Sequence, residues 1–141
     1  MAQRHRGSTH KFVNGRRALP IALVASFVLG SAAFAASPQT GATYVGTRGG
    51  GTTSLIKKVS LKVAASGTNA TALLYCGTSR QPSSAPKFTI TKGRFSAVRK
   101  TGGITLWTLR GRFVSKTTAV ATLNVVSTCD GKGGEITLKR K

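Results

Sequence analysis

Acidic side chains are almost absent from this chain. Its 141 residues include two acids, Asp130 and Glu135, against 22 lysines and arginines. Both histidines, His5 and His10, lie at the start of the chain, and only two cysteines are present. Calcium sites need clustered oxygen ligands, and structural zinc sites need four ligands, mostly cysteine and histidine. The sequence therefore predicts no metal site and no cofactor.

The scarcity of histidine also restricts catalysis. Beyond His10 no imidazole is available to activate a serine or cysteine nucleophile. Asp130 and Glu135 flank a loop with three glycines, and two suitably spaced carboxylates can hydrolyse a glycosidic bond. The same acids also fit a turn residue and an exposed ion pair. We expect a non-enzymatic protein without catalytic residues, with a small hydrolase that uses Asp130 and Glu135 as an alternative.

Long hydrophobic runs are missing except near the start of the chain. Leu19 to Leu29 form an apolar run that follows five lysines and arginines and precedes the small-residue site Ala33-Phe34-Ala35. This run is too short for a helix that crosses a hydrocarbon layer of about 30 Å. The layout predicts a signal peptide at residues 1–35 and a single secreted or extracytoplasmic domain at residues 36–141. A retained anchor is the alternative, and the export route stays open.

The two cysteines, Cys76 and Cys129, belong to the predicted exported domain. Two cysteines without histidine cannot complete a structural zinc site, and an oxidising compartment favours a disulfide. We therefore predict a Cys76–Cys129 bond.

Helical periodicity is absent beyond the predicted signal, and apolar residues recur with a period of two. Such alternation is typical of half-buried β-strands, and glycine-rich or proline-rich turns separate the runs. Eight runs fit this description: 43–46, 58–63, 70–75, 88–91, 95–99, 104–113, 119–125 and 136–138. The sequence predicts an all-β fold, an antiparallel β-sandwich of about seven or eight strands, with the segment Gln81 to Pro86 as its longest loop.

Several short segments resemble a loose group of small exported bacterial β-sandwich proteins of unknown function. The segments are Thr43-Tyr44-Val45-Gly46-Thr47, two Gly-Arg-Phe triplets, the run from Thr117 to Leu123, and Thr128-Cys129-Asp130. The resemblance covers nearly all of residues 43–138. It implies a β-sandwich and carries no activity.

Positive charge dominates the predicted mature domain, which holds 17 cations and two acids, a net charge of +15. Such a field attracts polyanions: wall polymers, acidic polysaccharides, extracellular nucleic acid and anionic membranes. The charge alternatively serves only solubility. We expect a structural or interaction module at the cell envelope or outside the cell with affinity for anionic polymers. A secreted cationic toxin or antimicrobial protein that acts on anionic membranes is an alternative.

The two Gly-Arg-Phe triplets belong to the similar segments Lys92 to Phe95 and Arg110 to Phe113. A three-residue loop at Thr101 to Gly103 would join them as neighbouring antiparallel strands. This register directs Phe95, Ala97, Trp107, Leu109 and Phe113 to the core. It places Arg94 opposite Arg110 and Lys92 opposite Arg112 on the other face.

Exposed aromatic residues are few, because the single tryptophan, Trp107, is predicted to face the core. Base stacking or sugar stacking is therefore not favoured. The candidate anion-binding residues are Lys92, Arg94, Arg110 and Arg112, because arginine pairs hold phosphate, sulfate or carboxylate. The alternative is a solvated outer face of a hairpin.

Overall fold

The computed structural model describes residues 35–47, 55–77, 81–129 and 133–141. These residues form nine β-strands: β1 Thr43–Gly46, β2 Ile56–Val63, β3 Asn69–Cys76, β4 Ser83–Ser84, β5 Phe88–Thr91, β6 Arg94–Thr101, β7 Ile104–Phe113, β8 Thr118–Val125 and β9 Gly134–Arg140. All eight predicted strands are present. The ninth, β4, lies in the segment Gln81 to Pro86 that was predicted to be a loop. Within the described residues no helix is long and apolar enough to cross a bilayer.

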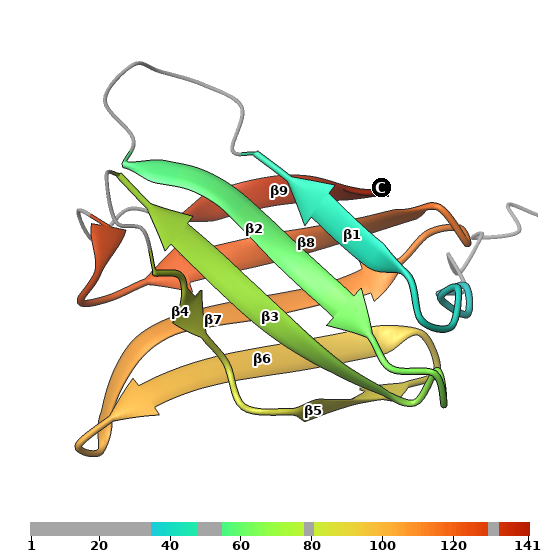
Figure 1. The fold of residues 1–141 in the computed structure, drawn as a ribbon, viewed down its shortest axis with the longest axis horizontal. Coiled ribbons are helices and arrows are strands. Elements are labelled where there is room, and N and C mark those ends of the chain that lie inside the picture. Colours follow the sequence, from blue (N-terminus) through green and yellow to red (C-terminus); the bar gives the residue numbers. More distant parts are fainter. Residues whose placement is uncertain (1–34, 48–54, 78–80, 130–132) are drawn as a thin grey trace, which may run out of the picture. The chain divides into compact units, whose positions relative to one another are not determined.

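The strands pair as one antiparallel sheet that closes on itself (Figure 1). Its order is β2-β1-β9-β8-β7-β6-β5-β3-β4, and a further pairing of β2 with β3 completes a ring of eight strands. Strand β4 stands outside the ring and pairs with β3 alone. The predicted sandwich is therefore wrong, because the fold is a closed eight-stranded β-barrel with one extra strand.

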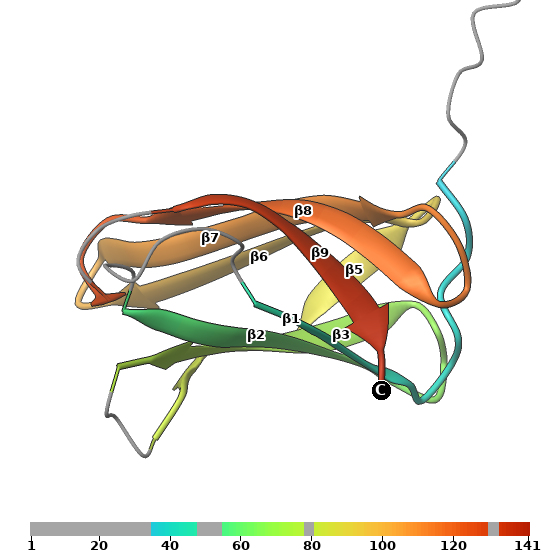
Figure 2. The same cartoon turned by 90° about the horizontal axis from the view of Figure 1, so that it is seen from above.

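Two short strands account for this closure. Strand β1 pairs with both β2 and β9, and β5 pairs with both β6 and β3, so the two walls are joined along part of each lateral edge. Figure 2 shows a flattened barrel with β6 to β9 in one wall and β1 to β3 in the other. A sandwich and a flattened barrel bury alternate residues in the same way, so the period of two could not distinguish them.

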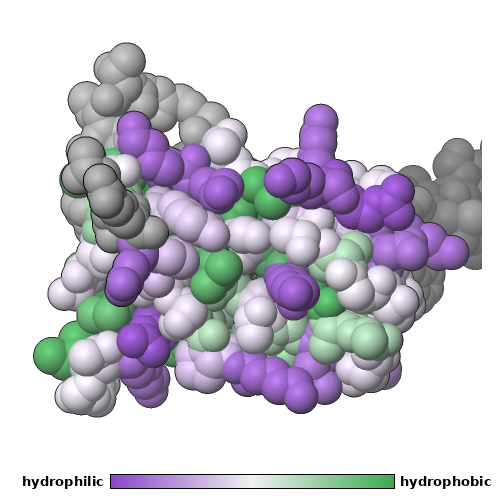
Figure 3. All heavy atoms as spheres, in the orientation of Figure 1, coloured by the Kyte–Doolittle hydropathy of each residue, from purple (hydrophilic) through white to green (hydrophobic). Residues whose placement is uncertain are grey.

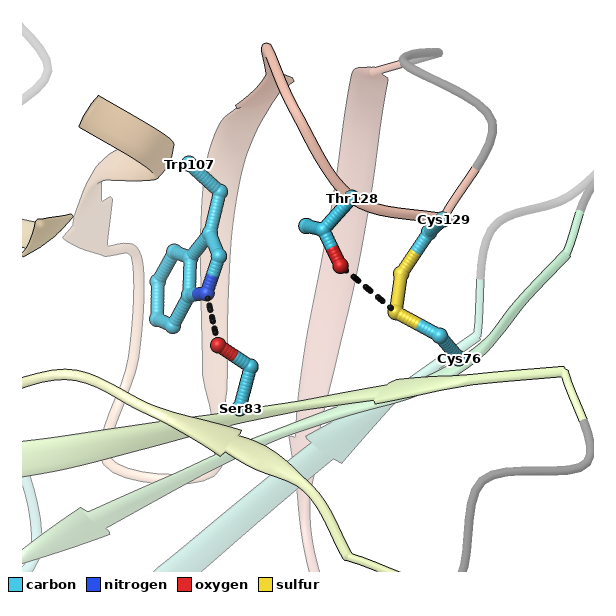
Figure 4. The surroundings of a disulfide bond; sticks show 5 residues. All are labelled: Cys76, Ser83, Trp107, Thr128 and Cys129. Carbon is cyan, nitrogen blue, oxygen red and sulfur yellow. Dashed lines mark hydrogen bonds between the residues drawn. A yellow bond between two sulfur atoms is a disulfide. The ribbon is translucent and has the colours of Figure 1, made fainter. Parts of the chain in front are cut away.

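The barrel interior is filled by side chains. The largest fully buried ones are Trp107, Tyr44, Phe113, Leu61, Leu74, Leu109, Leu138, Val59 and Val63. The ring of Phe113 contacts those of Tyr44 and Phe95, with centroids 5.0 and 5.4 Å apart. The buried Nε1–H of Trp107 donates to the Ser83 hydroxyl of β4 over 2.9 Å (Figure 4). The prediction that Trp107 faces the core is confirmed.

A disulfide between Cys76 and Cys129 joins opposite walls at one end of the barrel (Figure 4). Cys76 ends β3 and Cys129 follows β8, and these strands lie four places apart in the ring of eight. The Cα atoms are 5.1 Å apart, and the Thr128 hydroxyl donates to the Cys76 sulfur over 3.6 Å. The predicted bond is confirmed, and its position suits a staple that limits separation of the walls.

The segment before β1 packs against the other end of the barrel. The backbone N–H of Ala36 donates to the Phe113 carbonyl over 2.7 Å. The buried Tyr44 hydroxyl donates to the Lys116 carbonyl over 2.6 Å and accepts the Gln39 N–H over 2.9 Å. The chain thus joins the barrel at the first residue after the predicted cleavage site.

Candidate anion-binding groove

The β6–β7 hairpin has a different register from the one predicted. Its turn contains only Gly102 and Gly103, whose φ values of 55° and 80° suit a two-residue turn of type I′. A bulge then shifts the pairing between Arg99 and Lys100. Arg94 therefore lies opposite Arg112, not Arg110.

The predicted faces survive this correction because the predicted and observed registers differ by two residues. A shift of two positions changes the partners but leaves each side chain on the same side of the sheet. Phe95, Ala97, Leu109 and Phe113 are buried as predicted.

Two rows of side chains cross the outer face of the wall formed by β6, β7, β8 and β9. The pairings give one row of Arg94, Arg112, Val120 and Thr137, and a second row of Ser96, Arg110, Thr122 and Glu135. The inward row between them is Phe95, Gly111, Ala121 and Ile136. The two rows bring candidate residues from the hairpin together with side chains from β8 and β9.

An open hollow of about 1080 Å³ lies over these rows. It is lined by both outer rows, by the inward row between them and by Thr47, and we call it the arginine groove. Gly111 and Ala121 are the small residues of the inward row, and a glycine inside a strand permits a tight bend of a barrel wall. A Cβ at Gly111 would clash with the Val120 carbonyl oxygen and lie 2.8 Å from the Phe95 ring.

The three arginines of the groove form a triangle of positive charge. Directly opposed residues such as Arg94 and Arg112 have Cβ atoms about 4.5–5.5 Å apart, and diagonal neighbours such as Arg94 and Arg110 lie about 7–8 Å apart. Arg94 and Arg110 are exposed, and Arg112 is half-buried. Glu135 is separated from Arg110 by Thr122 on the strand between them.

No ion pair is formed within the part of the chain that the structure describes. Opposed like charges destabilise a sheet by some tenths of a kcal/mol. The cluster therefore carries an unfavourable interaction that an anion would relieve.

Lys92 lies outside the groove. It occupies the two-residue turn between β5 and β6 with φ 49°, in the left-handed region that side chains with a Cβ rarely adopt. The prediction that Lys92 lies opposite Arg112 is therefore wrong. Lys92 is exposed and lies two residues before Arg94 in the chain.

The proposed pair of catalytic acids cannot be placed as a pair, because Asp130 lies outside the described residues. Glu135 is exposed at the end of the second outer row. Among the residues with described positions, no group of three or more histidine, cysteine, aspartate or glutamate side chains is close enough to hold a metal ion.

The opposite wall has a different distribution of charge. Over β1, β2 and β3, hydrophilic side chains are spread among weakly polar ones (Figure 3). Lys57 and Lys62 are exposed there, and the Lys58 amine lies 4.1 Å from the centre of the Tyr75 ring, so that ring face is occupied. Lys62 has Thr43 and Thr71 as its two cross-strand neighbours.

The groove residues of β8 and β9 were not predicted from the sequence. Thr122 and Thr137 gave no signal, because isolated threonines occur throughout the chain. Only the registers of β7 with β8 and of β8 with β9 place them beside the arginines. Comparison of the chain with protein-family models, curated proteins and solved structures finds no match.

Proposed function

We propose that this protein is an exported, non-catalytic β-barrel that binds anionic polymers through the arginine groove. The observation that carries the proposal is the triangle of Arg94, Arg110 and Arg112 in one hollow, where none of the three forms an ion pair with a described residue. The acid that lines the hollow, Glu135, is separated from Arg110 by Thr122. Guanidinium groups bind phosphate, sulfate and carboxylate through two parallel hydrogen bonds. Hydroxyl groups from Ser96 and Thr122 supply further hydrogen bonds between the charges.

A polymer suits this groove better than a small molecule does. The hollow is open, and its aromatic lining is limited to Phe95, which is buried with only 5% of its surface exposed. Base-specific or sugar-specific stacking is therefore not favoured. The remaining cations of the domain strengthen the field around the groove and speed the approach of a polyanion.

The disulfide supports the exported setting. Disulfides form and persist in oxidising compartments, and the Cys76–Cys129 bond matches that condition. The amino-terminal layout agrees with export through a signal peptide that is cleaved after Ala35. Sequencing the amino terminus of the exported protein should give Ala36 first.

Salt-graded binding of the purified protein tests the proposal. We would measure affinity for heparin, duplex DNA and anionic phospholipid vesicles from low to high ionic strength. Salt screens the attraction between exposed charges that lie more than about 10 Å apart. The groove also offers hydrogen bonds at short range, so at least one polymer should stay bound under these conditions. Equal, steep loss of all three ligands with salt would indicate attraction by net charge alone and would contradict a groove. Leakage of the vesicles would favour the membrane-active alternative.

A further inference from the structure

Among the described residues, part of one edge of strand β6 has no partner strand at the disulfide end of the barrel. On the side away from β7, β6 pairs with β5 only at Arg94 and Phe95. Successive residues of an antiparallel strand direct their backbone groups to alternate sides. Thr101 pairs with Ile104 next to the turn, so its backbone groups point toward β7. By alternation, the N–H and C=O groups of Val98 and Lys100 point away from β7.

Nothing described in the structure uses these backbone groups. Among the described residues, no backbone hydrogen bond joins Val98 or Lys100 to a residue on that side. The extra strand β4 pairs with β3 and lies with the opposite wall at this end (Figure 2). Edge groups of this kind are a template for another strand.

A second observation at the same edge concerns Arg99. It lies opposite Trp107, whose side chain is inside the barrel, so the Arg99 side chain starts on the interior side of the sheet. Arg99 is half-buried, and its Nε is fully buried without a hydrogen-bond partner among the described residues. A buried donor without an acceptor is costly. The guanidinium group belongs to a residue that is only half-buried, so a carboxylate bound at this edge would hydrogen-bond to its other nitrogens and offset the charge.

The backbone groups and the positive charge of this edge determine which kind of molecule can bind there. Alternating N–H and C=O groups pair with another polypeptide backbone, as in strand addition, and do not match a sugar-phosphate chain. A second copy would bring its own Arg99 and Lys100 to the edge without an acid on that strand. Residues 1–34 contain no acid either. Neither of these segments supplies a carboxylate, so charge complementarity favours an acidic segment of another protein as the occupant.

We propose that the edge of β6 from Val98 to Lys100 binds an extended acidic segment of a partner protein by strand addition. The segment's backbone pairs with Val98 and Lys100, and one of its carboxylates accepts a hydrogen bond from Arg99. This site is separate from the arginine groove, which lies on the outer face and not at the strand edge.

A synthetic peptide of alternating glutamate and valine, blocked at both ends, is the probe. Its binding should slow hydrogen exchange at the Val98 and Lys100 amides and leave the Arg110 and Arg112 amides unchanged. The same peptide methylated at the alternate nitrogens that face β6 should bind at least about tenfold more weakly. Methylation at the other nitrogens should have little effect. This peptide pair needs no protein variant, so a folding defect cannot obscure the result.

Two protein variants separate this site from the groove. Arg99→Gln should weaken the peptide about tenfold or more without the same loss of heparin, because it removes a charged donor. Arg94→Gln with Arg112→Gln should lower heparin binding and leave the peptide bound. The proposal is overturned if both methylated peptides bind equally, if the groove variant loses the peptide, or if added peptide only dissociates a self-associated form of the protein.

Discussion

Arg94 and Arg112 lie directly opposite each other on β6 and β7, and neither forms an ion pair with any described residue. Two opposed cations on a sheet repel each other, and Arg110 adds a third charge beside them. A neutral pair would fold more stably. The arrangement is therefore unfavourable by itself, as the proposed anion-binding site would be without its ligand.

Replacing one of the opposed arginines should raise stability. We expect Arg94→Gln to increase the free energy of unfolding by a few tenths of a kcal/mol at low salt, because it removes a like-charge pair. The gain should shrink as salt screens the repulsion. Urea denaturation at two ionic strengths measures both effects. Lys62→Gln is the control, since threonines flank Lys62; an equal gain there would assign the effect to net charge.

The left-handed conformation of Lys92 predicts a second stabilising change. Lys92→Gly should raise the free energy of unfolding by roughly 0.5–1 kcal/mol, because glycine adopts φ 49° without a Cβ clash. Lys87→Gly removes the same charge at a position without positive φ and should give no gain. Thermal unfolding of the two variants compares them, and a gain at both positions would refute the conformational explanation.

The glycine of the second triplet should tolerate no side chain. Gly111→Ala should lower the free energy of unfolding by about 1–3 kcal/mol, because its Cβ would press on the Val120 carbonyl and the Phe95 ring. At Gly103 nothing lies within 4 Å of a new Cβ, so Gly103→Ala carries only the cost of its φ of 80°. Denaturant unfolding should rank Gly111→Ala as the more damaging. The reverse ranking would contradict the close approach of β7 and β8.

The disulfide should contribute strongly to stability. In the chain-entropy view, a bond that closes a loop of 53 residues stabilises the fold by about 4 kcal/mol. Cys76→Ser with Cys129→Ser should lose most of this amount, and reductant should destabilise the native protein but not the variant. Unfolding midpoints with and without reductant test the bond. An insensitive native protein would show that the staple is not formed in solution.

The sequence predicted individual strands far better than their closure. Alternation located eight strands and their buried faces, because each pattern is local. Closure depends on the pairings of β1 with β9 and of β3 with β5, which join distant segments and leave no mark in the alternation. The two-residue turn at Gly102 and Gly103 and the bulge beside it were also missed, and they changed every cross-strand partner in the hairpin.

The candidate site was predicted only in part, again because the local pattern does not show which residues are paired across strands. Arg94, Arg110 and Arg112 lie on one face as predicted, because the predicted register was wrong by an even number of residues. Lys92 does not, since it lies in the turn before β6. The rest of the groove comes from β8 and β9, whose contribution requires the registers of two further strand pairs.

We expect the groove, and not net charge alone, to hold the polymer. The most direct test is heparin affinity of Arg94→Gln/Arg112→Gln beside Lys57→Gln/Lys62→Gln, which removes the same charge from the opposite wall. The groove variant should lose about tenfold or more in heparin affinity, while the control should lose much less. Equal losses in the two variants would contradict it.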